Sequence, residues 1–327
     1  MITRSTTGWL RCAGPAIAVA ATVCALAADA RAAGECRFAR RPPVVLKAMG
    51  PCNFDLDALS FAGEPVQQAA CLLTPVQKIG RLGLPLAALP EVLANRVGRS
   101  VDPANAEALR DVLQERGLHD TLGVALSQPV AQANEGDPAA PYTNYFVIHD
   151  TSSPNFRGRP WPNDIDTDPS INNLRRYVCA NKIERGHVFI NRVGTVLVAH
   201  DFSVPWRATK FEMAVQFGAA LKGLFLHVEL VQPRRRDPGH RRMNDFQAPV
   251  PGFTSAQYDA LALVYVVASV RAGRWLIPAF HAVIDEGIRN KHDDPQNFEL
   301  EDFANSLETL TERLEKRDAA ATVKSVP

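Results

Sequence analysis

Residues 144–152 read Asn-Tyr-Phe-Val-Ile-His-Asp-Thr-Ser, and this stretch decides how the fold class is interpreted. The run from Tyr145 to Ile148 is short, apolar and continuous, which is typical of a buried β-strand. His149 follows directly, so its ring should emerge at the rim of the sheet. A polar side chain in that position is a candidate functional residue.

The next segments continue the β-type pattern. Residues 153–173 are rich in Pro, Asp and Asn, and we expect a long surface loop there. Residues 188–190 and 195–198 should form a β-hairpin, because Gly194 suits the turn between them. These segments place at least three short strands after residue 140.

A further strand is expected over residues 224–231. Side chains alternate with period two along a strand, so His227, Glu229 and Val231 should share one face. His227 could therefore line a cleft beside Glu229, or it could be a buried histidine with satisfied hydrogen bonds.

Two helices have clear sequence signals. Thr254 and Gln257 form a capping box, and the apolar run that follows ends at Gly273. That run is apolar on nearly every side, which indicates a helix packed between two layers. Residues 299–317 should form an amphipathic helix. Its apolar stripe contains Phe303, Leu307, Leu310 and Leu314.

These elements predict an α/β (mixed α+β) protein, with a central mixed β-sheet flanked by helices. Residues 34–135 should form an accessory, mainly helical region, including a helix that begins at Asp102 and ends at Gly117. A polar stretch containing Pro and Gly then marks a boundary, so we expect the main domain over residues 136–312. Residues 313–327 should be a flexible tail.

Composition excludes several classes of protein. The chain has 327 residues, of which 46% are hydrophobic and 22% are charged, as in ordinary globular proteins. The 36 Lys and Arg residues nearly balance the 35 Asp and Glu residues, leaving a net charge of +1. No overall field attracts a polyanion, so we expect no nucleic-acid partner.

The N-terminus resembles a secretory signal peptide over residues 1–33. Residues 1–11 carry two arginines and no acid, and an apolar run over residues 13–28 precedes Ala30-Arg31-Ala32. We expect cleavage near Ala32 or Ala33, a mature protein with no membrane span, and a periplasmic or secreted location. The alternative is an uncleaved anchor helix.

Removal of that segment would leave four cysteines in an oxidising compartment. We favour a local disulfide between Cys52 and Cys71 among the three possible connectivities. The alternative is four buried thiols. The four residues are Cys36, Cys52, Cys71 and Cys179.

Two histidines and an acid could bind a metal. His149 ends a strand, while His281 and the pair Asp293 and Asp294 come much later in the chain. Two imidazoles and one carboxylate, with a fourth position left to water, suit a catalytic Zn²⁺. Spacing alone is weak support, because the eight histidines of the chain permit such a set by chance.

Five segments in order raise this interpretation, because together they resemble the zinc-dependent N-acetylmuramoyl-L-alanine amidases. This family includes phage lysozyme-like amidases and peptidoglycan-recognition proteins. The resemblance covers roughly residues 140–312 and leaves the accessory region uncovered. The segments are Asn144 to Ser152, His187 to Thr195, Val228-Glu-Leu230, Phe253 to Tyr258 and Lys291-His-Asp-Asp-Pro295.

The resemblance implies a role for each matched residue. His149 and His281 match the two histidine ligands of zinc, and Asp294 before Pro295 best matches the third ligand. Glu229 matches the catalytic glutamate of the family. Such residues would hydrolyse the amide between N-acetylmuramic acid and the L-alanine of the stem peptide, with peptidoglycan or a muropeptide as the substrate.

The match departs from the family pattern after His281. The connection to the third ligand is longer than usual, so Asp293 or His292 could replace Asp294 as ligand. The lysine that often stabilises the oxyanion is replaced by His292, with Lys291 adjacent, and either cation could serve.

Three hypotheses about the function therefore stay open. The first is an exported zinc amidase, and the second is a peptidoglycan-binding protein of the same fold without activity. The third is a zinc hydrolase of another amide or ester. His187 could contact substrate or make a structural hydrogen bond. The oligomeric state is left open by the sequence.

Overall fold

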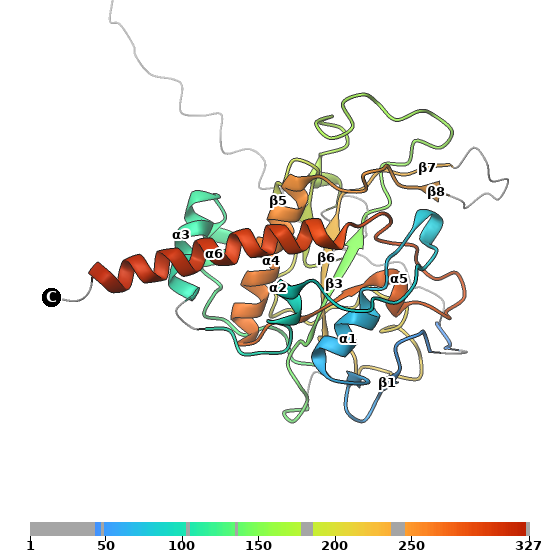
Figure 1. Cartoon of the computed structure of the whole chain (residues 1–327). Coiled ribbons are helices and arrows are strands. Elements are labelled where there is room, and N and C mark those ends of the chain that lie inside the picture. Colours follow the sequence, from blue (N-terminus) through green and yellow to red (C-terminus); the bar gives the residue numbers. More distant parts are fainter. Residues whose placement is uncertain are drawn as a thin grey trace, which may run out of the picture.

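A computed structural model defines the fold around one five-stranded sheet with the strand order β5-β4-β6-β3-β9 (Figure 1). The strands are β3 (Tyr145–Asp150), β4 (Val188–Ile190), β5 (Val196–Val198), β6 (Phe225–Leu230) and β9 (Ile277–Phe280). The structure describes residues 43–46, 49–102, 105–134, 137–177, 186–236 and 246–324.

The sheet is mixed, as expected. β3 lies parallel to β6 and to β9, and β4 lies parallel to β6. Only β5 runs antiparallel to its neighbour, because it forms the predicted hairpin with β4. All six residues of β3 and of β6 are buried, including the polar residues at the carboxyl end of β3 and within β6.

Helices α4 (Ser255–Ala272) and α6 (Leu300–Lys324) cover the sheet in successive layers (Figure 1). The capping box at Thr254 is present, and the helix ends at Gly273 in the left-handed conformation with φ 68°. α4 contacts both β4 and α6, which confirms a helix packed between two layers. α6 extends beyond the predicted residue 317.

Shorter elements complete the fold. The segment before β3 holds β1 (Phe54–Asp55), β2 (Ser60–Phe61), α1 (Pro65–Leu72), η1 (Lys78–Gly80), α2 (Glu91–Ala94), α3 (Asn105–Glu115) and η2 (His119–Gly123). The rest are η3 (Leu174–Tyr177), β7 (Arg235–Arg236), β8 (Phe246–Gln247) and α5 (His281–Ile284).

The helical segment before residue 135 shares one hydrophobic core with the sheet. α1 packs against β9, and α3 packs against α6. The hydroxyl of Tyr145, on β3, accepts a hydrogen bond from the backbone N–H of Phe61 at 2.8 Å and donates one to Gln68 at 2.7 Å. These contacts join the accessory region closely to the central strand.

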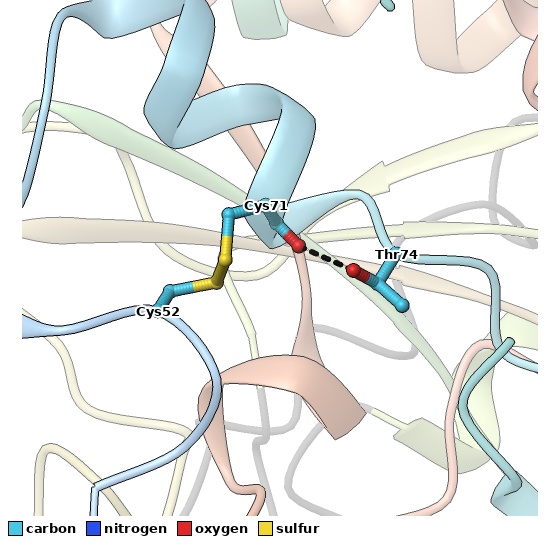
Figure 2. Close-up of a disulfide and its surroundings, with 3 residues drawn as sticks. All are labelled: Cys52, Cys71 and Thr74. Atoms are coloured by element: carbon cyan, nitrogen blue, oxygen red, sulfur yellow. Dashed lines mark hydrogen bonds between the residues drawn. A yellow bond between two sulfur atoms is a disulfide. The ribbon is translucent and has the colours of Figure 1, made fainter. Parts of the chain in front are cut away.

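The disulfide between Cys52 and Cys71 is formed, as predicted (Figure 2). It ties the chain before β1 to the last turn of α1, where Thr74 donates a hydrogen bond to the carbonyl of Cys71. Cys36 and Cys179 lie outside the described residues, as does the predicted signal segment 1–33.

None of the helices among the described residues is both long and apolar enough to cross a membrane.

Candidate metal centre

Three chain segments meet at the carboxyl end of the central strands. β3 and β9 are parallel neighbours, with Ile148 paired to Phe280. The next residue on each is a histidine: His149 in β3, and His281 as the first residue of α5. Parallel strands present their carboxyl ends at the same edge, so this register alone brings the two imidazoles together.

Asp294 completes a group of three buried donors. The Nδ1 atoms of His149 and His281 are 2.8 Å apart, and Asp294 Oδ2 lies 3.1 Å from His281 Nδ1 and 3.7 Å from His149 Nδ1. A circle through these three atoms has a radius of about 1.9 Å, small enough for one cation with bonds of ~2.0–2.2 Å to reach them all. The group could therefore hold a metal ion.

Asp293, one of the two alternative ligands, lies outside the donor group. One of its carboxylate oxygens is 3.7 Å from Arg234, and the other accepts a hydrogen bond from Gln296 at 2.7 Å. Asp294 is buried, and its carboxylate accepts a hydrogen bond from the backbone N–H of Asp150. The structure therefore brings Asp294 into the donor group.

Asp285 lies on the side of the His281 ring that faces away from the donor group. Its Oδ2 lies 3.1 Å from His281 Nε2, and its Oδ1 accepts a hydrogen bond from the backbone N–H of Phe211. Burial opposes a charge on His281, yet the carboxylates of Asp294 and Asp285 hold its pKa well above the usual range. Each ring nitrogen thus faces a carboxylate: Nε2 faces Asp285, and Nδ1 faces Asp294 in the donor group.

The first histidine is held by another histidine. His149 Nε2 lies 3.0 Å from Nδ1 of His227, whose Nε2 is 3.2 Å from Glu212. Burial and the neighbouring rings of His281 and His227 lower the pKa of His149 well below the usual range. A neutral imidazole is the form that binds a metal.

His187 and His227 are buried histidines with satisfied hydrogen bonds. His187 Nδ1 accepts a hydrogen bond from the backbone N–H of His227, and its Nε2 donates to the carbonyl of Val204. Burial lowers the pKa of His187 to about 3, so this ring is neutral at physiological pH. The hydrogen bonds of His187 match the structural alternative.

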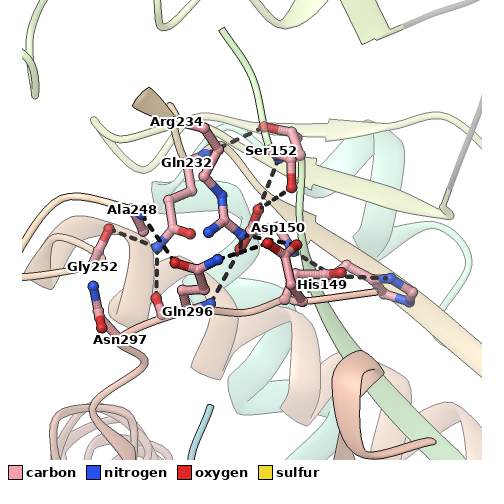
Figure 3. A network of polar contacts seen from close by, with 12 residues as sticks. His149, Asp150, Ser152, Gln232, Arg234, Ala248, Gly252, Gln296 and Asn297 are labelled. Atoms are coloured by element: carbon pink, nitrogen blue, oxygen red, sulfur yellow. Dashed lines mark hydrogen bonds and ion pairs between the residues drawn. The ribbon is translucent and has the colours of Figure 1, made fainter. Parts of the chain in front are cut away.

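Asp150 ties the donor segments together (Figure 3). Its carboxylate accepts hydrogen bonds from Arg234 Nη2 at 2.6 Å, from the backbone N–H of Gln296 at 3.3 Å and from both the backbone N–H and the hydroxyl of Ser152. Its own backbone N–H donates to Asp294. One side chain therefore connects the strand carrying His149 to the loop carrying Asp294.

Glu229 is placed beside the first ligand. It is the register partner of His149 on the neighbouring strand β6, and it lies two residues after His227. The three side chains share one face of the sheet, because register partners in parallel strands point the same way. Glu229 is buried.

The two candidate oxyanion-stabilising residues are placed differently. The His292 ring stacks on His281 with centroids 4.0 Å apart, and its Nδ1 lies 2.6 Å from Asp285. Lys291 forms an ion pair with Glu286 on the other side of the turn. His292 is therefore the one of the two that lies next to the donor group, where burial and the neighbouring His281 lower its pKa.

Sequence reasoning missed four residues that support the site. They lie behind the ligands and make long-range contacts, so only Asp285 had a usable signal, its position four residues after His281 in a helical turn. The four are Asp150, Glu212, Arg234 and Asp285.

Comparison of the chain with models of protein families, with curated proteins and with solved structures finds no match in any of the three.

Proposed function

We propose that this protein is an exported zinc-dependent N-acetylmuramoyl-L-alanine amidase that acts on peptidoglycan or on a muropeptide. One observation carries the proposal: His149 Nδ1, His281 Nδ1 and Asp294 Oδ2 meet in one buried group. Two imidazoles and one carboxylate suit a catalytic rather than a structural zinc, because three protein ligands leave the fourth position to water or substrate.

The residues around the donors have suitable chemistry for amide hydrolysis. Zinc, when bound, supplies a Lewis acid for the carbonyl and lowers the pKa of water to ~7. The carboxylate of Glu229 takes the proton of the attacking water and delivers it to the leaving amine of L-alanine. In its protonated form His292, which stacks on His281 and directs Nδ1 at Asp285, would donate through Nε2 to the oxyanion that develops on the carbonyl.

The substrate class rests on the order of the five sequence segments and on the signal-like segment 1–33. The bacterial cell wall lies outside the cytoplasmic membrane, so an exported enzyme can reach it. Periplasmic or secreted location is part of the proposal.

The test combines metal analysis with mass spectrometry of digested sacculi. We expect one zinc per chain, with free stem peptides and intact glycan strands as the products. Asp294→Asn should lose both zinc and activity, whereas Asp293→Asn is the matched control and should keep both. Glu229→Gln should keep zinc and lower kcat about 10²–10⁴-fold.

Three results would contradict the amidase. Binding to sacculi without zinc or cleavage would indicate the recognition protein of the same fold. Cut peptides or sugars, with the lactyl amide intact, would indicate a different hydrolase. Equal loss of zinc in Asp293→Asn and Asp294→Asn would mean that the donor group is assigned wrongly.

A further inference from the structure

A row of three buried side chains leads away from the donor group. His149 Nε2 lies 3.0 Å from His227 Nδ1, and His227 Nε2 lies 3.2 Å from Oε2 and 3.3 Å from Oε1 of Glu212. Glu212 comes from the turns between β5 and β6, and it is fully buried. A buried carboxylate needs compensating hydrogen bonds, so its partners define its role.

The other partners of the Glu212 carboxylate are all donors. Its Oε2 accepts hydrogen bonds from the backbone N–H groups of Ala208 and Thr209 and from the hydroxyl of Thr209, at 3.2, 3.0 and 2.8 Å. In all of these contacts the carboxylate oxygen is the acceptor. His227 Nε2 must therefore carry the proton in its contact with Glu212.

This requirement passes along the row. A neutral imidazole has one N–H and one lone pair, so a proton on His227 Nε2 leaves a lone pair on His227 Nδ1. That lone pair faces His149 Nε2, which then carries the proton of His149. The Nδ1 lone pair of His149 consequently points into the donor group.

The geometry points to Glu212 and His227 as positioning residues that set the tautomer of His149 for metal binding. This inference rests on the proposed metal centre and deepens it. His281 receives the same support in one step, from Asp285. Partners behind the ligands of this kind typically contribute ~10–100-fold to metal affinity.

Glu212→Gln is the sharpest variant, because it keeps the shape of the side chain. The amide oxygen must face the three donors at Ala208 and Thr209, so the amide NH₂ faces His227. His227 Nε2 then has to accept, its proton moves to Nδ1, and His149 receives a donor at Nε2. The proton of His149 is forced onto Nδ1, which blocks the metal-binding atom.

The experiment measures ring tautomers and zinc affinity on the full chain. Long-range ¹H–¹⁵N correlation spectra of the metal-free protein should show His149 and His227 protonated on Nε2. In Glu212→Gln both should shift to the Nδ1–H form. Zinc affinity, measured by competition with a chromophoric chelator, should fall about 10–100-fold.

His187→Gln is the matched control. His187 stacks on His227 with centroids 5.8 Å apart and is equally buried, but it bonds only backbone groups and stands outside the row. This variant should lose stability while keeping the tautomer of His149 and the zinc affinity of the wild type.

Two outcomes overturn the inference without touching the proposed function. The first is an Nδ1–H tautomer of His149 in the metal-free wild type, which needs no variant to fold. The second is an unchanged zinc affinity in folded Glu212→Gln. Absence of amidase activity in the wild type would instead contradict the proposed function. It would leave the inference intact, because the tautomer measurement requires neither zinc nor substrate.

Discussion

The two ends of β3 differ sharply in chemistry. At its amino end Tyr145 stacks on Phe225 and meets Phe61 edge-on, with ring centroids 5.0 and 5.2 Å away, and one hydroxyl is the polar group of that side chain. At its carboxyl end His149 and Asp150 are equally buried, but they belong to a network of imidazoles, carboxylates and Arg234. The strand therefore joins an apolar anchor to a polar site.

This difference separates contacts that stabilise the fold from contacts that cost free energy. Apolar and aromatic contacts stabilise the fold through burial, whereas buried charges cost desolvation that their partners only offset. Apolar residues of similar volume can often replace such a network without loss of stability. Its presence therefore indicates a role other than folding. In α/β sheets that role is found at the carboxyl ends of parallel strands.

Breaking the polar end should have the largest effect on stability. Asp150→Ala leaves the guanidinium of Arg234 buried without its 2.6 Å partner, so urea unfolding should show a loss of about 3–5 kcal/mol. Zinc affinity should fall too, because the Asp150 carboxylate also accepts a hydrogen bond from the backbone N–H of Gln296, in the loop that carries Asp294. Asp293→Ala is the control, with about 1 kcal/mol or less expected. Similar losses in both variants would remove Asp150 from this role.

Removal of the disulfide tests the region at the amino end of β3. Replacing Cys52 and Cys71 together by serine opens a loop with a sequence separation of 19, which should lower the free energy of unfolding by about 3 kcal/mol. Thermal or urea unfolding measures the loss. Zinc affinity should stay at the wild-type value, and a parallel fall would show that the two ends are coupled.

Tyr145→Phe should give the smallest effect. It keeps the aromatic contacts but leaves the backbone N–H of Phe61 and the side chain of Gln68 without their hydroxyl partner, a cost of about 1–2 kcal/mol. Urea unfolding at fixed pH gives the value. A change in zinc affinity here would contradict the separation of the two ends.

Local signals predicted much of the fold. The apolar run after Asn144 is β3, the capping box at Thr254 begins α4, and Gly273 ends it, because each signal acts within a few residues. The pairing of Cys52 with Cys71 was also predicted, since a short loop favours local closure. The end of α6 was predicted too early: Arg313 and Arg317 pair with Glu115 of α3, a contact that no local pattern shows.

The donor group was predicted as three residues, but its supports were not. His149, His281 and Asp294 have types that suit a metal, so chemistry alone suggested them. Glu212 and Asp150 are ordinary acids in the sequence. Their roles depend on which strands become neighbours, and this pairing is a property of the folded sheet rather than of any short motif.

The donor group is discontinuous in the chain, with a sequence separation of 132 between His149 and His281. A ribosome makes the chain from its amino end, so β3 and its histidine exist long before β9 and the Asp294 loop leave the exit tunnel. Any nascent chain that stops short of residue 294 lacks at least one donor. The complete group of three donors thus exists only in a chain that extends past residue 294.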